Sequence, residues 1–289
     1  MRLPYQKLHG CQNEYLFVDL LSAESKSLND VDFGGLSRQY SNRESGIGSD
    51  GLILLFPPQD PSKADVRMQI FNADGSEAEM CGNGIRCLAK VFHEHHREKS
   101  DTKPIRVETL AGVRECFLID TADPERFMVR VNMGRPSFLP TNIPVEFDDV
   151  MVIEEEFEVE DKEFLVSCVS LGNPHCVVDV ESLENFEVAH YGPLIEKHPA
   201  FPKGVNVEFI EIKNDQVSQR TWERGSGETK ACGTGACAVG MTLIMRKKLK
   251  SPVDIHLQGG DLRVEWDGLR EAWLTGEAVS GPTGELEIT

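Results

Sequence analysis

The sequence lacks long hydrophobic runs and any excess of basic residues, and both absences restrict its function. No stretch approaches the roughly 18 apolar residues of a membrane-spanning helix, and the first ten residues, MRLPYQKLHG, lack the apolar core of a signal peptide. Lysine and arginine number 30 against 48 aspartates and glutamates, which gives a formal net charge of -18. The two absences predict a cytoplasmic protein. Because the negative charge repels phosphate backbones and anionic lipids, we expect the protein to bind neither nucleic acid nor membranes.

Cysteine is too sparse for a disulfide scaffold, with eight residues in a chain of 289. In a reducing compartment these side chains remain thiols, so the question is which of them react. Two begin a repeated motif, Cys-Gly-x-Gly, at Cys81–Gly84 and Cys232–Gly235. Each copy follows a Gly-Ser segment and precedes apolar residues at helical spacing. The repeat predicts two similar halves, each with one thiol at the start of a helix.

Most of the remaining chain has the pattern of short strands punctuated by Gly, Pro and Asn. The expected strands are Tyr15–Leu20, Gly51–Phe56, Val66–Phe71, Phe127–Met133, Phe164–Val169, Cys176–Val180, Val205–Ile212, Leu262–Trp266 and Gly284–Ile288. The acidic run Glu154–Asp161 alternates with Phe157 and Val159, which favours a solvated edge strand. We therefore expect an α+β protein of two lobes, residues 1–123 and 124–277, with the C-terminal strand (residues 278–289) completing the first lobe.

A thiol at a helix start combines an anion-binding site with a reactive group. Unpaired backbone N–H groups and a partial positive charge bind a carboxylate and favour a thiolate. A free thiol titrates near ~8.5, and a helix terminus contributes roughly 0.3 to 2 kcal/mol, so a further group is needed to hold a thiolate at neutral pH. Two thiols in one cavity favour one thiolate and one thiol. The thiolate removes the α-proton of an amino acid and the thiol returns one to the opposite face, which inverts the centre without a cofactor.

The other thiols fit packing roles. Cys87 and Cys237 fall on other faces of the two predicted helices, and three more lie in strand-like runs, namely Cys116, Cys168 and Cys176. The spacings are not the close pairs of structural zinc sites. Residues 93–96, His-Glu-His-His, are expected to be solvated at a helix end, so no metal is predicted.

A dinucleotide fingerprint also occurs, Gly233-x-Gly235-x-x-Ala238. The polar segment 223–229 stands where that motif requires a buried strand, which excludes nicotinamide and flavin cofactors. The sequence alone thus predicts no cofactor.

Two segments of the chain, residues 71–87 (FNADGSEAEMCGNGIRC) and 222–238 (WERGSGETKACGTGACA), resemble the two cysteine motifs of the diaminopimelate epimerase family. Supporting segments span nearly the whole chain in order: VNMGRP (131–136), SLGNPHCVV (170–178), FPKGVNVEFIEI (201–212) and LQGGDLRVEW (257–266). The resemblance implies two pseudo-symmetric lobes, each a sheet wrapped around a central helix, with the active site between them, and a homodimer. It also implies interconversion of LL- and meso-2,6-diaminoheptanedioate, for lysine and peptidoglycan synthesis, without pyridoxal phosphate or metal.

The resemblance also assigns residues. Cys81 and Cys232 are implied as acid and base, and His175 and Glu223 as the polar partners that tune them, with the pairing left open. Because amides both donate and accept hydrogen bonds, asparagines suit a substrate that is zwitterionic at both ends. The implied substrate ligands are Asn13, Asn72, Gly82, Asn83, Asn173, Asn206, Glu223, Arg224, Gly233 and Thr234.

Two departures from the family pattern bear on substrate choice. The segment Cys11-Gln12-Asn13-Glu14-Tyr15 stands where the family usually reads x-Gly-Asn-Asp-Phe, and Gly51 follows Asp50 where a side-chain ligand often occurs. A racemase of another amino acid, such as histidine, is therefore an alternative. A non-catalytic amino-acid-binding protein is a further alternative. The two intact thiol motifs argue against it, because binding alone needs the N–H groups of the helix starts and not the sulfurs.

Overall fold

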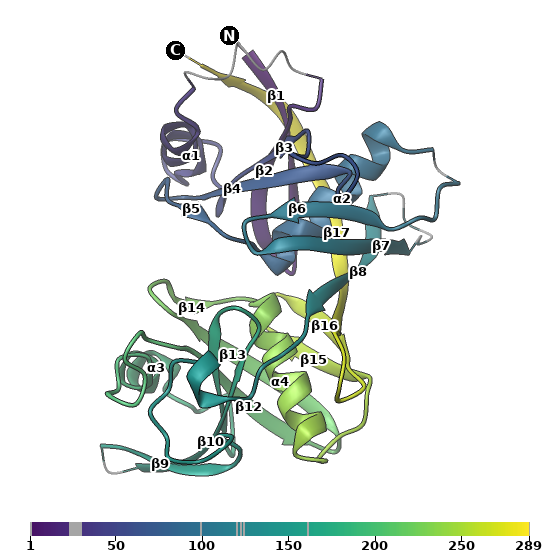
Figure 1. Cartoon of the computed structure of the whole chain (residues 1–289). Coiled ribbons are helices and arrows are strands. Elements are labelled where there is room, and N and C mark those ends of the chain that lie inside the picture. Colours follow the sequence, from purple (N-terminus) through teal and green to yellow (C-terminus); the bar gives the residue numbers. More distant parts are fainter. Residues whose placement is uncertain are drawn as a thin grey trace. The chain divides into compact units, whose positions relative to one another are not determined.

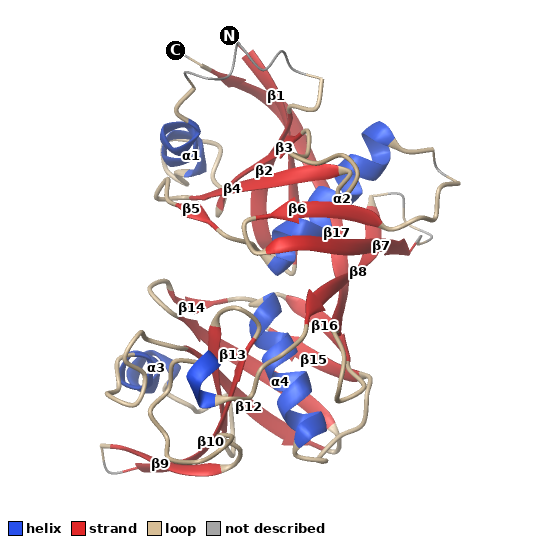
Figure 2. Ribbon diagram, viewed as in Figure 1, coloured by secondary structure: helices blue, strands red, loops and turns tan. Residues whose placement is uncertain are grey.

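The chain divides into two compact units, which are described separately. The computed structural model describes residues 2–22, 31–98, 100–119, 121, 123, 125–160 and 162–288. One unit comprises Met1–Val131 and Gly276–Thr289, and the other Asn132–Thr275. Figure 1 follows the chain through both units, and Figure 2 shows the helices against the strands. No helix in the described ranges is long and apolar enough to cross a membrane.

The first unit surrounds one buried helix with strands. Its elements are β1 (Arg2–Gly10), β2 (Asn13–Asp19), α1 (Phe33–Ser41), β3 (Gly51–Phe56), β4 (Val66–Asn72), β5 (Glu77–Ala78), α2 (Gly82–His96), β6 (Ile105–Thr109), β7 (Gly112–Ile119), most of β8 (Arg126–Gly134) and the end of β17 (Ala272–Glu287). The helix α2 contacts β1, β2, β3, β4, β6 and β7, and its residues 82–92 are all buried.

The second unit is built in the same way around α4 (Gly233–Met245). Its other elements are a short 3-10 helix (Pro140–Asn142), β9 (Glu155–Val159), β10 (Lys162–Ser170), β11 (Pro174–Asp179), α3 (Val188–Glu196), β12 (Asn206–Lys213), β13 (Gln216–Glu223), β14 (Gly227–Thr229), β15 (Val253–Leu257), β16 (Gly260–Glu265) and the start of β17. The helix α4 contacts β10, β11, β12, β15 and β16.

The strand pairings of the two units follow one pattern. In the first unit β1–β2 is antiparallel, β2–β3 parallel, β3–β4 antiparallel, β4–β6 parallel and β6–β7 antiparallel. In the second unit β10–β11, β11–β12, β12–β13, β13–β15 and β15–β16 repeat this order. The predicted α+β fold class, with a sheet around a central helix in each of two pseudo-symmetric lobes, is confirmed.

Several sequence expectations can be placed on this fold. The segment 121–125, where the lobe boundary was expected, connects β7 to β8 within the first unit, and residues 122 and 124 lie outside the described ranges. Strand β9 buries Phe157 and Val159 and exposes the glutamates between them, as the alternation predicts; Asp161 of that acidic run is not described. The thiols assigned to packing are all buried: Cys87, Cys116, Cys168, Cys176 and Cys237.

Candidate active site

Both motif cysteines are the N-cap residues of the central helices. Cys81 has an extended backbone (φ -131°, ψ 122°), and its Sγ accepts a hydrogen bond from the N–H of Gly84 at 3.4 Å. Cys232 has nearly the same conformation (φ -117°, ψ 115°), and its Sγ accepts from the N–H of Gly235 at 3.3 Å. Sulfur thus takes the place of the oxygen that usually caps a helix. In both units the thiol lies at the positive end of a helix dipole.

The last glycine of each motif is required by close packing. A Cβ added at Gly84 would lie 2.5 Å from Cδ1 of Ile53, and one at Gly235 would lie 2.6 Å from Oε1 of Glu208. Side-chain atoms do not approach this closely, so a larger residue would displace its neighbour. The repeated Cys-Gly-x-Gly pattern therefore has a structural reason in each unit.

Around Cys81, two donors point at the sulfur. The hydroxyl of Tyr15 donates to Sγ at 3.4 Å, in addition to the N–H of Gly84. The thiol in turn lies 3.6 Å from Oδ1 of Asn13, which also accepts from Nδ2 of Asn83 at 3.4 Å. Two predicted ligands, Asn13 and Asn83, thus lie beside Cys81, while the sequence analysis gave no role to Tyr15.

The unusual loop before Tyr15 keeps a tight hairpin shape without its glycine. Cys11 and Gln12 form a two-residue loop between β1 and β2, with φ of 52° and 59°. Positive φ at both loop positions is typical of the type I′ turn that matches strand twist. Asp50 holds the following strand, because it accepts from Nδ2 of Asn13 at 2.8 Å and from the N–H of Glu14 at 2.7 Å.

Gly51 occupies a position with no room for a side chain. A Cβ there would lie 2.2 Å from the carbonyl oxygen of Phe71 and 3.1 Å from Cε1 of Tyr15. The ring of Tyr15 therefore lies against the place where a ligand at position 51 would begin.

A buried cation lies on the first turns of α2. Arg86 is fully buried, and its guanidinium donates to the carbonyl oxygens of Gly82 and Glu277, to Oδ1 of Asn83 and to Sγ of Cys11. Each of these acceptors is formally neutral. Within the described residues these hydrogen bonds give the cation no opposite charge, which is costly for a buried group, so the surroundings of Cys81 favour a nearby anion.

In the second unit a chain of hydrogen bonds leads from Cys232 to a buried carboxylate. Sγ of Cys232 lies 3.4 Å from Oγ1 of Thr234, which accepts from Nδ2 of Asn173 at 3.2 Å. Oδ1 of Asn173 lies 3.1 Å from Nε2 of His175, and Nδ1 of His175 lies 2.8 Å from Oε1 of Glu208. Both imidazole nitrogens therefore lie within hydrogen-bond distance of an oxygen. The predicted residues Asn173, His175 and Thr234 are brought together here.

Glu208 is a member of this site that sequence motifs alone do not single out. It is fully buried on β12, and its Oε2 has no hydrogen-bond partner within the described ranges. The available signal was a glutamate inside an apolar strand run, since residues 206–210 of β12 are all buried. Such a position is rarely occupied by a charge unless that charge is paired.

The loop that carries Glu223 and Arg224 is fixed from two sides. Oδ1 of Asn206 accepts from the N–H of Arg224 at 3.0 Å, and Nδ2 of Asn206 donates to the carbonyl of Pro174 at 2.8 Å. Glu196 accepts from the N–H of Gly225 at 2.9 Å and from Nε1 of Trp222 at 2.7 Å. Asn206, which is expected to bind substrate, thus also connects the backbone of Pro174 to that of Arg224.

Glu223 is the last residue of β13, and its Oε1 accepts from the hydroxyl of Thr229 at 2.6 Å. In the first unit, Asn72 ends β4 and donates from Nδ2 to Oγ of Ser76 at 3.1 Å. Asn72 and Glu223 therefore hold matching places at the ends of equivalent strands.

The surroundings of Cys232 oppose its ionisation. Burial raises the pKa of the Cys232 thiol well above its ordinary value, and the negative charges of Glu223 and Glu208 raise it further. Hydrogen bonds from Thr234 and from the N–H of Gly235 act in the opposite direction and only partly offset this. Cys232 is therefore a thiol at neutral pH in the absence of substrate.

The two half-sites match residue by residue. Asn13 and Tyr15 at the start of β2 hold the places that Asn173 and His175 hold at the start of β11. Tyr15 pairs with Gly51 across the parallel β2–β3 ladder, and His175 pairs with Asn206 across β11–β12. The remaining predicted ligands, Gly82 and Gly233, begin α2 and α4.

Comparisons with known proteins agree in both sequence and fold. The model of the family described as diaminopimelate epimerase matches residues 5–139 and 167–280. The diaminopimelate epimerase of Agathobacter rectalis is 44% identical over 295 residues, covering 99% of this chain and 100% of the relative. That of Halothermothrix orenii is 42% identical over 291 residues, covering 100% and 99%.

Solved structures with lower identity share the fold. A hydroxyproline epimerase from Agrobacterium vitis with bound trans-4-hydroxy-L-proline has a TM-score of 0.68 at 18% identity, covering 99% of this chain and 92% of that one. A PhzF-family phenazine biosynthesis protein from Bacillus anthracis has a TM-score of 0.67 at 16% identity, with all of both chains covered.

Proposed function

Because the chain belongs to the diaminopimelate epimerase family, we propose that this isomerase interconverts LL- and meso-2,6-diaminoheptanedioate, in lysine and peptidoglycan precursor synthesis. The observation that carries the chemistry is the repeated N-cap cysteine, one in each unit, with its sulfur at the positive end of a central helix. The N–H groups of these helix starts suit the α-carboxylate of an amino acid. No group other than thiols is needed for the proton transfers.

The reaction removes one proton from one face of a single α-carbon and adds one proton to the opposite face. One cysteine, as thiolate, takes the α-proton and becomes a thiol, while the other, as thiol, gives its proton to the opposite face and becomes a thiolate. The sum of charges on the two sulfurs does not change. The product leaves with inverted configuration, and the two sulfurs return to their starting state by exchange with solvent or by turnover in the reverse direction.

We infer further that Cys81 is the thiolate and Cys232 the thiol in the substrate-free enzyme. Cys81 receives hydrogen bonds from Tyr15 and Gly84 and shares its helix with the buried cation Arg86, all of which favour an anion and together oppose the single long contact with Oδ1 of Asn13, which favours the thiol. By contrast, burial and two carboxylates raise the pKa of Cys232. The carboxylate of Glu223 then suits the role of keeping Cys232 protonated until it gives its proton to carbon, and His175 that of stabilising the resulting thiolate through Asn173 and Thr234.

Alkylation tests this assignment. The reduced enzyme is treated with iodoacetamide between pH 6 and 10, and alkylation at Cys81 and at Cys232 is followed by mass spectrometry of their peptides. Cys81 is expected to react first at neutral pH, and Cys232 only at higher pH. Faster reaction of Cys232 at pH 7 would reverse the assignment while leaving the two-thiol mechanism intact.

Proton NMR in deuterated water tests the function itself. With LL-diaminopimelate and reduced protein we expect the meso isomer to form and deuterium to enter the α-carbon. Cys81→Ala and Cys232→Ala are each expected to abolish epimerisation. Deuterium exchange of another amino acid but not of diaminopimelate would retain the chemistry and overturn the substrate. No exchange in any amino acid would favour a binding protein.

One observation keeps a different amino-acid substrate as the second candidate. In the first unit no side chain fits at Gly51, and the hydroxyl of Tyr15 lies against Cys81. Both features alter the groups around Cys81 that a substrate would meet. A panel of amino acids that includes histidine, screened by the same deuterium exchange, distinguishes a racemase from a diaminopimelate epimerase.

We also infer a cytoplasmic homodimer, as the family resemblance implies. A reducing compartment keeps the two reactive sulfurs as thiols, which the reaction requires. Light scattering during size-exclusion chromatography tests the assembly, and twice the 32.2 kDa chain mass is the expected result.

A further inference from the structure

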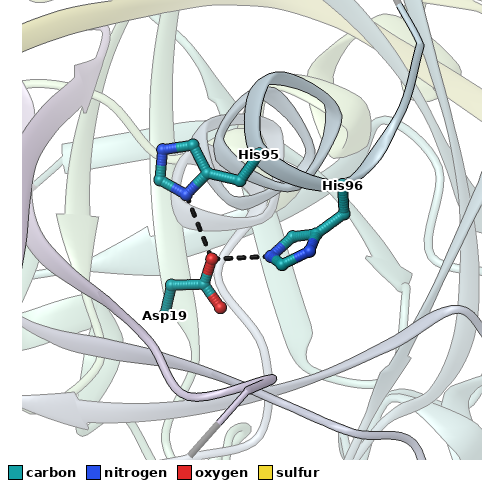
Figure 3. Close-up of side chains that lie close together, drawn as sticks. All are labelled: Asp19, His95 and His96. Carbon is teal, nitrogen blue, oxygen red and sulfur yellow. Dashed lines mark hydrogen bonds and ion pairs between the residues drawn. The ribbon is translucent and has the colours of Figure 1, made fainter.

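Three potential metal ligands converge at the C-terminal end of α2, away from the N-cap of that helix. Nδ1 of His95 lies 3.0 Å and Nε2 of His96 2.6 Å from the same oxygen, Oδ2 of Asp19, which ends β2. Figure 3 shows both rings pointing at this oxygen. The three ligand atoms lie within 4.8 Å of one another. The sequence predicts a solvated surface for this histidine segment, because nothing in it places Asp19 beside the histidines.

Two of the three ligands are held in position by other contacts. Oδ1 of Asp19 accepts a hydrogen bond from the N–H of Leu21 at 3.1 Å, so Oδ2 is left for the imidazoles. The ring of His96 packs on Phe92 with a centroid distance of 5.4 Å. Contacts of this kind orient metal ligands and lower the entropy lost on binding. The side chains of Asp19 and His96 are 22% and 26% exposed, and that of His95 is 46% exposed, which leaves access from solvent.

The chemistry of the ligand set selects a class of ion. Two imidazole nitrogens and one carboxylate oxygen suit Zn²⁺ and the neighbouring divalent transition metals, whereas Mg²⁺ and Ca²⁺ prefer oxygen alone. With Zn–N and Zn–O bonds of about 2.0 to 2.2 Å, ligand atoms of a tetrahedral site lie roughly 3.4 Å apart, so Oδ2 of Asp19 and each imidazole nitrogen would need to separate by less than about one ångström. With neutral imidazoles the group carries one negative charge, in a protein whose net charge is -18.

We propose that Asp19, His95 and His96 form a binding site for Zn²⁺ or a similar divalent transition metal, with water completing the coordination. This site is separate from the thiol chemistry. It joins the C-terminal ends of β2 and α2. At their other ends the same two elements are joined through Cys81, which caps α2 and contacts Asn13 and Tyr15 of β2. A bound ion would therefore stabilise the unit that carries Cys81.

Calorimetric titration of the reduced protein with Zn²⁺ tests the proposal. We expect one ion to bind at this site. A free Zn²⁺ concentration ten times the dissociation constant stabilises the folded protein by about 1.4 kcal/mol, which should raise the midpoint of thermal unfolding by about 2 to 4 °C. Loss of a residue that only contacts a metal ligand typically weakens binding roughly tenfold to a hundredfold. Because the proposed ligands bind the ion directly, we expect a larger loss of Zn²⁺ affinity in each of His95→Gln, His96→Gln and Asp19→Asn. Each should also abolish the thermal shift.

The matched control is His256→Gln. His256 is an exposed histidine paired with a single carboxylate, since its Nδ1 lies 2.8 Å from Oδ1 of Asp261. This variant should bind Zn²⁺ as the unaltered protein does. Asp19→Asn preserves shape and keeps one oxygen, so it remains informative even if a histidine variant folds poorly.

Cobalt(II) distinguishes this site from the thiols. We expect Co²⁺ to give visible bands without a thiolate-to-metal charge-transfer band, and these bands should disappear in His96→Gln. A charge-transfer band that is lost in Cys81→Ala would place the ion on sulfur and overturn the proposal. Equal Zn²⁺ affinity in the unaltered protein, His95→Gln and His96→Gln would also overturn it, and so would the absence of saturable binding. The two catalytic cysteines are unaltered in the Asp19, His95 and His96 variants, so failure here leaves the proposed epimerase function untouched.

Discussion

Glu208 lies 2.8 Å from Nδ1 of His175, and both side chains are completely buried. Burying an ion pair has a desolvation cost that its attraction only partly offsets, so such pairs are retained where an orientation or a charge is used. Here the pair fixes the imidazole so that its other nitrogen meets Asn173, from which hydrogen bonds lead to Cys232. Glu208 therefore acts as a positioning residue, since it influences Cys232 through other groups.

Glu208→Gln should change the ionisation of Cys232 without unfolding the protein. The amide keeps an oxygen for His175 but removes the negative charge that raises the pKa of Cys232. The pKa of Cys232 should therefore fall toward its ordinary value, and its alkylation rate at pH 8 should rise. We expect kcat to fall roughly tenfold to a hundredfold, with KM little changed, because the buried partner of His175 loses its charge.

The control for this variant is Glu158→Gln, an exposed glutamate on β9, which should change neither quantity. An alkylation rate at Cys232 that is the same in Glu208→Gln and in the unaltered enzyme would show that the buried carboxylate has only a structural role. Glu208→Ala is a less suitable variant, because it leaves a buried histidine without a counter-charge, a loss that costs about 3 to 5 kcal/mol.

Tyr15→Phe should make Cys81 a weaker acid. The hydroxyl donates to Sγ at 3.4 Å, and a hydrogen bond to a charged group contributes about 1.5 kcal/mol, or about one pKa unit. Alkylation of Cys81 at pH 7 should slow up to about tenfold, while that of Cys232 stays constant. Tyr191→Phe, in the second unit, is the control. If Cys81 reacts equally fast in Tyr15→Phe, the hydroxyl does not stabilise the thiolate.

The features that the sequence predicted are those that depend on residues close to one another in the chain. The cysteine caps, the apolar helix faces after them and most of the strands are encoded within a few residues of each position. The Glu208–His175 pair joins residues 33 apart, and it depends on the parallel register of β11 and β12, which sets His175 opposite Asn206. Sequence pattern gives no such register. The contact between Tyr15 and Gly51 depends in the same way on β2 and β3.

The family resemblance assigned Asn206 as a ligand, and the structure shows that this residue also braces a loop. Both ends of its amide are engaged, on Pro174 and Arg224, so it positions the loop of Glu223. Side-chain direction at such a site depends on the fold around it. Residue type and motif place Asn206 at the site, and only the structure identifies its partners.

Gln12→Gly should stabilise the protein. Gln12 has a φ of 59°, a conformation that costs a residue with a Cβ about 1 kcal/mol and costs glycine little. The gain in free energy of unfolding should be slightly below that value, because glycine also loses more backbone entropy on folding. Urea unfolding measures it. Asp215→Gly is the control, since Asp215 has a φ of 62° in the β12–β13 hairpin but aspartate tolerates this region better. An equal gain at both positions would contradict the argument.

The buried thiols should make stability fall at alkaline pH. Burial raises the pKa of Cys87 to about 12 and that of Cys116 to about 12, whereas the unfolded chain releases these protons near the ordinary value of 9.0. Between pH 9 and 12 the unfolded state therefore binds fewer protons than the folded state. The linkage relation then requires the free energy of unfolding to decrease as pH rises, by up to about 1.4 kcal/mol per pH unit for each thiol.

Cys87→Ala isolates this contribution. The variant loses a constant amount of stability from the cavity, but its free energy of unfolding should fall less steeply above pH 9, by up to about 1.4 kcal/mol per pH unit. Val91→Ala, at another buried position of α2, creates a cavity without removing an ionisable group and should keep the original slope. Urea unfolding under reducing conditions at pH 7, 9 and 10.5 gives the three slopes. If all three proteins lose stability in parallel, lysine and tyrosine titration, common to all of them, accounts for the loss, and the Cys87 thiol does not ionise on unfolding as its burial requires.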